Sequence, residues 1–455
     1  MVPQLVLGSL VLLASAAQVH ANGRPAATST INFRQGNEQH IAAGMTFGLL
    51  VSKDGGTTWR WMCEDAVKYS GMYDPDYAYT STGALIATTF TGVLINRDGC
   101  SFNDTTFGMK FMSAIALGPT GHVFAGTVHP EDPATSDPGD SKIYRSTDDG
   151  LTFPVSAMPA AVGLWWSSIE VAPTNANRVY LSGYRLVNGD RLFELYKSNN
   201  GGTSYTAITS AGITTTLNST IEIVGISKLD QDHVFARVTY QNVNTISDAI
   251  FRTIDGGATW TKIREAQDEL AFVVRGNGDL VVGGKNTGAF VSRSPSNGAA
   301  WEPLATAPHV NCLVENAAGE VWACAQNFGS PQVPADGAGI MKSTDLVTWT
   351  PVLRFQDILG PVDCPVGTLQ QDACVNPPPP LPKPWCALRN QFGITSNPTN
   401  CPALFDAPPD ATSGDGTVKV PDPGCCDTNA GGSPAGLALG ALVAMLLIRP
   451  RRRRA

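Results

Sequence analysis

Short runs of alternating hydrophobic and polar residues follow one another through most of the chain. STIEIVGIS, HVFARVTY, AIFRT and ATWTKIRE, between residues 219 and 265, are four such runs in succession. They are rich in Val, Ile, Thr and aromatic residues and are separated by Gly, Asn and Asp, which is the pattern of β-strands joined by turns. No long stretch between the two ends of the chain has a sustained helical period. The pattern therefore predicts an all-β protein.

One turn recurs between the runs. It reads SKDGGTTW at 52–59, STDDGLTF at 146–153 and TIDGGATW at 253–260, with degenerate copies at 96–102, 198–205, 294–301 and 343–349. The copies are spaced 42 to 55 residues apart, counted between the centres Asp54, Asp98, Asp148, Asn200, Asp255, Asn297 and Asp345. A period in this range is typical of propeller blades. We therefore predict a seven-bladed β-propeller of four-stranded antiparallel blades over residues 28–355.

The residues of the turn have structural roles. The Asp carboxylate can accept hydrogen bonds from nearby backbone N–H groups, and the Gly allows a positive φ. The terminal Trp or Phe can pack its ring between sheets. We expect the turn to join the third strand of a blade to the fourth and to build the scaffold.

The pattern S-x-D-x-G-x-T-W resembles the BNR or Asp-box repeat. This repeat occurs in sialidases, sortilin-type receptors, xyloglucan hydrolases and photosystem assembly factors. The resemblance covers about 70 % of the chain and implies the propeller fold. It implies no single activity, because families that share the turn differ in function.

The direction of the chain within a blade predicts where a site would lie. If the repeated turns lie on one face, the loops between second and third strands and those between blades lie on the other. Two of these loops are rich in aromatic residues: AVKYSGMYDPDYAY and VGLWWSS. The candidate ligand-binding residues are Tyr73, Asp74, Asp76, Tyr77, Trp165 and Trp166. Their rings could stack on sugars, or they could pack between blades.

An acidic loop, HPEDPATSDPGDS, is a weaker candidate. Its residues His129, Glu131, Asp132, Asp137 and Asp140 could offer oxygens to Ca²⁺. The spacing lacks the regular alternation of a calcium loop, so a solvated acidic loop is the favoured interpretation. No other metal or cofactor is predicted.

The sequence favours binding over catalysis. The sialidase resemblance would imply an Arg-Ile-Pro motif and an arginine triad, but the motif is missing and Arg34 and Arg275 are the chief arginines on predicted inner strands. A glycosidase also needs two carboxylates about 5–9.5 Å apart. Asp76 and Glu170 are among the acids near the predicted face, with no spacing that pairs them. A non-catalytic module for glycan or protein ligands is thus the main hypothesis, and a glycoside hydrolase the alternative.

Both ends of the chain predict export. Residues 1–21 read as a secretory signal peptide. Residues 431–455 hold a short apolar helix followed by an arginine cluster, after PGCCDTNAGGSP. This end resembles the MYXO-CTERM sorting signal of myxobacterial surface proteins, which implies processing at Cys425 or Cys426 and display on a Gram-negative cell surface. A plain membrane anchor is the alternative. The net charge of −8 predicts no attraction to nucleic acid.

The ten cysteines fit an oxidising compartment. Cys312 and Cys324 flank a predicted hairpin and are expected to bond across it. Cys63 and Cys100 are a possible further pair. Residues 356–430, rich in Cys and Pro, read as a stalk with two bridges in one of three pairings. The stalk cysteines are Cys364, Cys374, Cys386 and Cys401.

Overall fold

The computed structural model describes residues 24–401, except for short gaps. The gaps are 70–72, 106–110, 128–140, 157–162, 188–189, 217–218, 242–245, 268–270, 296, 331, 397–398 and 400. The predicted signal peptide, the acidic loop, Cys425, Cys426 and the predicted membrane helix lie outside the described residues. None of the helices in the described part is long and apolar enough to cross a membrane.

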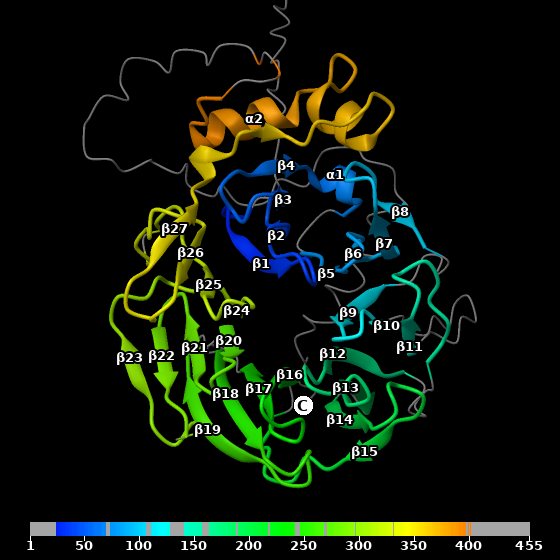
Figure 1. The fold of residues 1–455 in the computed structure, drawn as a ribbon, viewed down its shortest axis with the longest axis vertical. Coiled ribbons are helices and arrows are strands. Elements are labelled where there is room, and N and C mark those ends of the chain that lie inside the picture. The colour runs from blue at the N-terminus through cyan, green and yellow to red at the C-terminus, as the bar shows by residue number, and fades with distance from the viewer. Residues whose placement is uncertain are drawn as a thin grey trace, which may run out of the picture. The chain divides into compact units, whose positions relative to one another are not determined.

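Residues 28–353 form a seven-bladed β-propeller, which confirms the predicted fold (Figure 1). The first blade contains β1 (Thr28–Phe33), β2 (Ile41–Met45), β3 (Gly48–Ser52) and β4 (Arg60–Met62). The second contains β5 (Tyr77–Tyr79), β6 (Leu85–Thr89), β7 (Gly92–Asn96) and β8 (Asn103–Asp104). The third contains β9 (Met112–Leu117), β10 (Val123–Thr127) and β11 (Ile143–Ser146). In the third blade an isolated antiparallel bridge, Tyr144 to Val155, takes the fourth position.

The other four blades continue in chain order around the ring. They are β12 (Trp165–Val171), β13 (Val179–Val187), β14 (Asp190–Ser198) and β15 (Thr206–Ile208); β16 (Thr220–Ile226), β17 (Val234–Gln241), β18 (Ile246–Thr253) and β19 (Thr261–Ala266); β20 (Ala271–Val274), β21 (Leu280–Gly284), β22 (Gly288–Ser292) and β23 (Glu302–Leu304); and β24 (Cys312–Glu315), β25 (Val321–Cys324), β26 (Ile340–Ser343) and β27 (Thr350–Leu353). In each blade the first strand lines the central channel and the later strands lie progressively outward (Figure 1).

The second strand of a blade is the best-buried one. Every residue of β2 (IAAGM), β6 (LIATT), β10 (VFAGT) and β21 (LVVGG) is buried. A strand in the middle of a blade is covered on both faces by neighbouring blades, so small and β-branched residues replace the alternation of a half-exposed strand. Burial of these apolar strands stabilises the contacts between blades.

The repeated turn joins the third and fourth strands and closes on its own side chains. In the turn after β18, Thr253 Oγ1 donates to Asp255 Oδ1 (2.6 Å) and accepts from the N–H of Gly257 (2.9 Å). The Asp255 carboxylate accepts the N–H groups of Ala258 and Thr259, both at 2.9 Å. Gly257 has φ +95°, a conformation that favours glycine. Corresponding bonds surround Asp54, Asp148 and Asn200.

Asn297 departs from the predicted pattern. The turn after β22 has two extra residues, and the N–H of Gly298 bonds to Ser292 Oγ (2.9 Å) as Gly257 does to Thr253. Asn297 itself has φ +52°, close to the +68° of Gly256. It therefore occupies the left-handed glycine position of the turn. The expectation that its side chain replaces the turn aspartate is wrong.

The segment after β27 packs on the propeller. It contains η1 (Phe355–Asp357), β28 (Gly360–Pro361), η2 (Gln370–Val375) and α2 (Pro384–Phe392), while α1 (Glu64–Val67) follows the first blade. β28 pairs with β4 in parallel, and Trp385, Phe392 and Val375 belong to the core of the first blade. For residues 356–401 the expected stalk is therefore wrong, because these residues bury apolar side chains against the ring.

The disulfides explain this packing. Cys312–Cys324 and Cys386–Cys401 are bonded. Cys63 and Cys100 do not bond to each other: Cys63 bonds to Cys374 and Cys100 to Cys364. The idea of a Cys63–Cys100 pair and of two bridges within the tail is wrong, because two of the tail cysteines reach back to the first and second blades.

Candidate functional site

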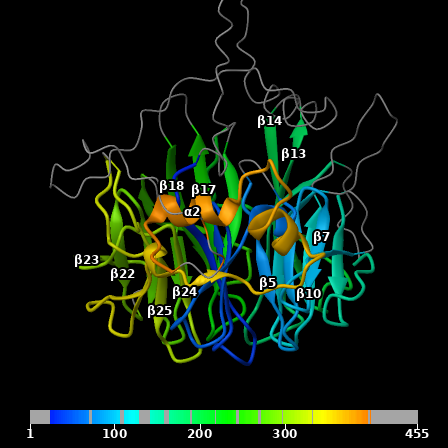
Figure 2. The same cartoon turned by 90° about the horizontal axis from the view of Figure 1, so that it is seen from above.

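The two faces of the ring carry different loops. The face with the turns between third and fourth strands, here called the turn face, also carries the loops between first and second strands. The other face, here called the opposite face, carries the loops between second and third strands and between blades. The hairpins β13–β14 and β17–β18 are the longest and extend on the opposite face (Figure 2).

Loops on the turn face are tied to one another. Gln35 Nε2 donates to the carbonyl of Gly118 (3.0 Å), from the first blade to the third. The Glu38 carboxylate accepts the N–H of Ala317 at 2.9 and 3.0 Å, joining the first blade to the seventh. Arg34, a predicted inner-strand arginine, donates to the carbonyl of Ser81 at 2.8 Å. These side chains serve the neighbouring loops.

A cavity of about 480 Å³ on the turn face has paired charges. The Glu315 carboxylate is buried and accepts hydrogen bonds from Lys228 Nζ (2.7 Å), Arg275 Nε (3.1 Å) and the N–H of Gly276 (2.6 Å). Arg275 also donates to the carbonyl of Gly319 at 2.9 Å. Since both predicted inner-strand arginines are engaged by the protein itself, neither forms part of a carboxylate-binding triad.

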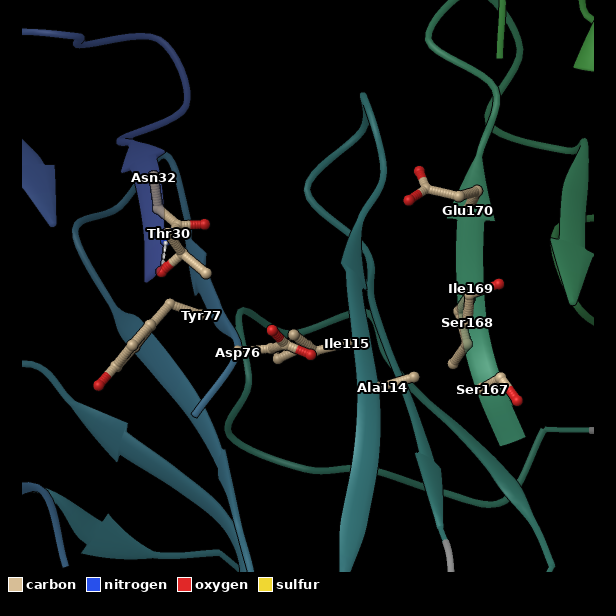
Figure 3. Close-up of a pocket in the computed structure, with 10 residues that line it drawn as sticks. All are labelled: Thr30, Asn32, Asp76, Tyr77, Ala114, Ile115, Ser167, Ser168, Ile169 and Glu170. Atoms are coloured by element: carbon tan, nitrogen blue, oxygen red, sulfur yellow. Dashed lines mark hydrogen bonds between the residues drawn. The ribbon is translucent and has the colours of Figure 1, made fainter. Parts of the chain in front are cut away.

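A second cavity, of about 250 Å³, lies in the central channel against the first four blades. Figure 3 shows its lining, which comes from the inner strands β1, β9 and β12 and the start of β5. The lining residues are Thr30, Asn32, Asp76, Tyr77, Ala114, Ile115, Ser167, Ser168, Ile169 and Glu170. Hydroxyl, amide and carboxyl groups line most of it, and we call it the central cavity.

Two carboxyl groups of the central cavity have raised pKa values. Burial raises the pKa of Glu170 to about 8, with a further contribution from the negative charge of Asp76. Loss of hydration raises the pKa of Asp76 to about 6, and Glu222 and Asp74 add to this. The Asp76 side chain is accessible from the channel, but the surrounding strands displace much of its bulk water. At pH 7 Glu170 is thus mainly protonated and Asp76 mainly ionised.

The carboxyl groups differ in their partners. Glu222, on β16, forms an ion pair with Arg237 on β17. Neither Asp76 nor Glu170 receives a hydrogen bond to its carboxyl group from any residue in the described part of the chain. Glu170 as an acid and Asp76 as a base therefore face one polar cavity, and their carboxyl groups can bind a molecule that enters it.

Three of the predicted ligand-binding residues are structural. Asp74 forms a bidentate ion pair with Arg24, at 2.6 and 3.0 Å. Tyr77 is buried between the first two blades, although it also contributes to the lining of the central cavity. Trp166 is 1 % exposed, and its Nε1 donates to the carbonyl of Ser141 (3.1 Å). The prediction that Trp166 contacts a ligand is wrong, because its ring fills the space between the third and fourth blades.

Tyr73 belongs to an aromatic cluster on the opposite face. Its ring lies 4.7 Å from that of Phe90 and 5.4 Å from that of Phe111, and these two phenylalanines stack at 4.7 Å. The Tyr73 hydroxyl bonds to Thr88 Oγ1 (3.0 Å) and donates to the carbonyl of Met112 (3.1 Å). Phe90 is 51 % exposed, so this cluster, the Tyr73 cluster, presents a ring to solvent.

Trp165 belongs to a second aromatic cluster, on the fourth blade. Its ring stacks on Tyr184 at 5.9 Å, and Tyr184 lies 6.1 Å from Phe193. The Arg191 guanidinium lies 4.6 Å from the centre of the Tyr184 ring, a cation–π contact. Cross-strand pairing places Trp165, Tyr184 and Phe193 side by side on one face of the blade. This Trp165 cluster lies at the start of β12, where the strand begins at the opposite face.

Sequence reasoning missed Phe90, Phe111, Tyr184 and Phe193. The isolated phenylalanine in the TTFTG turn was a usable signal, since an aromatic ring at a hairpin turn has no core to enter. Tyr184 and Phe193 could be found only from the register of β13 with β14. Among the described residues no group of three or more His, Cys, Asp or Glu side chains could hold a metal ion.

Comparisons with known proteins return only fold likenesses. No protein-family profile and no curated protein matches the chain. An ancestral GH74 enzyme shares 16 % identity over 66 % of this chain and 44 % of its own, with a TM-score of 0.49. The extracellular domain of a putative hybrid two-component system from B. thetaiotaomicron shares 12 % identity over 66 % and 37 %, with a TM-score of 0.47.

A Hadza microbial sialidase, Hz136, shares 12 % identity over 68 % of this chain and 72 % of its own, with a TM-score of 0.39. The chain spans less than half the length of the two proteins named before it. The neighbours therefore include the extracellular domain of a putative two-component system as well as glycoside hydrolases, and neither kind is singled out.

Proposed function

We propose that the protein is an exported propeller of the Asp-box type that binds a glycan or, alternatively, a protein ligand on its opposite face. The observation that carries the proposal is the pair of aromatic clusters around Tyr73 and Trp165. Both lie on the opposite face, next to the inner strands that line the central cavity. The exposed Phe90 ring and the half-buried Trp165 ring suit the apolar C–H face of a sugar, and the polar cavity suits its hydroxyl groups.

Export to the cell surface is part of the proposal. Four disulfides within residues 63–401 support an oxidising compartment. The signal peptide and the MYXO-CTERM-type end, with Cys425 and Cys426, rest on the sequence. Replacing both cysteines with Ser should release or mislocalise a protein that still folds. Normal surface display of that variant would leave only a plain membrane anchor.

A glycan array with the purified protein tests the binding function. We expect one class of glycan to be retained and the bound glycan to be recovered intact. The rings supply contact area, so binding should survive moderate salt, unlike purely ionic adhesion. Retention of no glycan, together with capture of a defined surface protein, would shift the proposal to the protein ligand.

The glycoside hydrolase alternative has one observation of its own. Glu170, protonated near pH 7, and Asp76, ionised there, have the different pKa values expected of an acid–base pair. Hydrolysis of the retained glycan should then follow a bell-shaped pH profile between about 6 and 8 and fall by orders of magnitude in Glu170→Gln. Intact glycan after long incubation from pH 5 to 8 would exclude this alternative for that glycan.

A further inference from the structure

The ring closes at a junction that the blades themselves do not lock. Each blade is built from consecutive strands, so the first blade holds β1–β4 and the seventh β24–β27. Among the described strands these two blades exchange none, and the fifth strand of the first sheet, β28, comes from the segment after the seventh blade. Every other junction is crossed by the chain on its way from blade to blade, whereas this junction joins the two ends of the propeller. We call it the seam.

Direct contacts across the seam are noncovalent, and Trp322 and Ile340 of the seventh blade share one apolar core with the first blade. Thr28 Oγ1 donates to the carbonyl of Gly339 (2.9 Å), and the rings of Phe33 and Trp322 meet edge to face at 5.1 Å. The Glu38 carboxylate reaches the N–H of Ala317. Among the described residues no disulfide joins the first blade directly to the seventh, so the two ends of the propeller are held by noncovalent contacts.

The segment after β27 crosses the seam and is bonded on the far side. After Leu353 the chain leaves the seventh blade, pairs with β4 at Gly360 and Pro361, and continues to Cys364. Cys364 bonds to Cys100 in the second blade, and Cys374 returns to Cys63 beside the first. The bonded partners are 264 and 311 residues apart. Figure 1 shows this segment outside β4.

Apolar packing reinforces the crossing. Phe47 of the first blade lies 5.1 Å from Phe355 and 4.9 Å from Phe392, measured between ring centres. Phe328 of the seventh blade lies 5.9 and 5.6 Å from the same two rings. Two tail rings thus sit between aromatic rings of the blades on either side of the seam. Adding a Cβ at Gly339 would bring it within 2.2 Å of Phe355, so this packing is tight.

A buried glutamine adds a polar connection. The Gln370 side chain is fully buried; its Oε1 accepts the N–H of Cys63 (3.1 Å) and its Nε2 donates to the carbonyl of Trp61 (2.9 Å). The two long-range disulfides differ in access. Cys63, Cys364 and Cys374 are buried, whereas Cys100 is partly exposed in the turn after β7. A thiol can therefore approach the Cys100–Cys364 bond before the Cys63–Cys374 bond.

We infer that residues 354–401 are a latch that holds the propeller closed across the seam, and that reduction of the Cys100–Cys364 disulfide loosens that seam selectively. In this step a dithiol thiolate attacks Cys100 Sγ, and Cys364 leaves as a thiolate. The second thiol of the reagent then displaces Cys100. Two electrons pass to the protein, the reagent becomes a cyclic disulfide, and its two protons go to the cysteines.

Graded reduction of the folded protein tests the latch. Dithiothreitol is added stepwise, free thiols are alkylated and mapped by mass spectrometry, and amide hydrogen exchange is measured in each blade. We expect Cys100 and Cys364 to be labelled before Cys63 and Cys374, and exchange in β1 and β24 to become at least about tenfold faster at the step at which they are labelled. Exchange in β16 and β17, across the ring, should be unchanged. A uniform increase in all blades, or none at the seam, would overturn the inference.

Paired variants give an independent test with a matched control. Cys100→Ser with Cys364→Ser removes a bond between tail and blade, whereas Cys386→Ser with Cys401→Ser removes one within the tail. Only the first pair should speed exchange at β1 and β24. Equal seam exchange in both pairs would contradict the latch. If the first pair does not accumulate as folded protein, reduction of the folded wild type still decides.

Discussion

The turn face differs from the channel and the opposite face in how far its functional groups are satisfied by the protein itself. On the turn face, carboxylates such as those of Asp255 and Glu315 are saturated by hydrogen bonds from the protein. In the channel, Asp76 and Glu170 have no such partner among the described residues, and on the opposite face Phe90 presents its ring to solvent. A group already satisfied by its own chain gains little from a ligand.

The comparison teaches that repetition marks the scaffold here. The repeated residues of the turns build loops that need no partner. The residues that occur only once lie in loops of unequal length, and their polar groups and rings are the ones that can still bind a ligand. Function should therefore be sought where the seven blades differ from one another.

The largest effect is expected at the Trp165 cluster. Trp165→Ala should weaken binding of the glycan retained on the array by roughly 10- to 100-fold, typical of a central aromatic anchor. Phe90→Ala should weaken it less, because this ring is exposed at the end of its cluster. Titration calorimetry measures both. Leu229→Ala, an exposed apolar residue of the turn face, is the control and should leave affinity unchanged. Loss of binding in the control would reverse the assignment of faces.

A smaller effect, on stability alone, is expected from the interior of a turn. Thr253→Val keeps the shape of the side chain but leaves the buried N–H of Gly257 without its acceptor. The free energy of unfolding should fall by about 1–3 kcal/mol. Asp255→Ala should cost less, about 1 kcal/mol, because the N–H groups of Ala258 and Thr259 are exposed and can bond to water. Denaturant titration gives both values, and ligand affinity should not change in either variant.

The carboxyl groups of the channel should make the free energy of unfolding depend on pH. The pKa of Glu170 is raised from 4.5 to about 8, so the folded protein holds this proton more tightly than the unfolded chain. The contribution of Glu170 to stability is therefore most favourable below pH 4.5 and is lost as pH rises from 4.5 to 8. Between pH 5 and 8 the free energy of unfolding of Glu170→Gln should exceed that of the wild type by roughly 1–2 kcal/mol. This is less than the full pKa shift implies, because water in the channel screens the charge. Parallel thermal melts that stay superimposable would contradict the raised pKa.

The sequence predicts the ring well and the site only in part. The turns repeat in sequence, so the blades could be counted before their pairing was known. Which of Trp165 and Trp166 faces outward depends on a register shift between Trp166 and Ser168 that alternation alone does not reveal. The Cys63–Cys374 and Cys100–Cys364 bonds join segments brought together only by closing the ring. Such contacts have no local signal, so the sequence alone predicts a stalk where the structure has a packed segment.

The smallest predicted effect separates two asparagines of the turn face. Asn200 takes the place of the turn aspartate: its Oδ1 accepts the N–H of Ser204 (2.9 Å) and its Nδ2 donates to Ser204 Oγ (2.8 Å). Asn200→Gly loses these two bonds and the one that Ser198 Oγ donates to Asn200 Oδ1 (2.9 Å), and should lower the free energy of unfolding by about 1 kcal/mol. Asn297 instead occupies the left-handed glycine position, so Asn297→Gly relieves a positive φ and should change stability by less than about 0.5 kcal/mol. The same substitution at two turns thus has two outcomes, measurable by urea denaturation of the two variants side by side. Equal losses would mean that Asn297 also holds its turn through its side chain, as the spacing of the repeats first suggested.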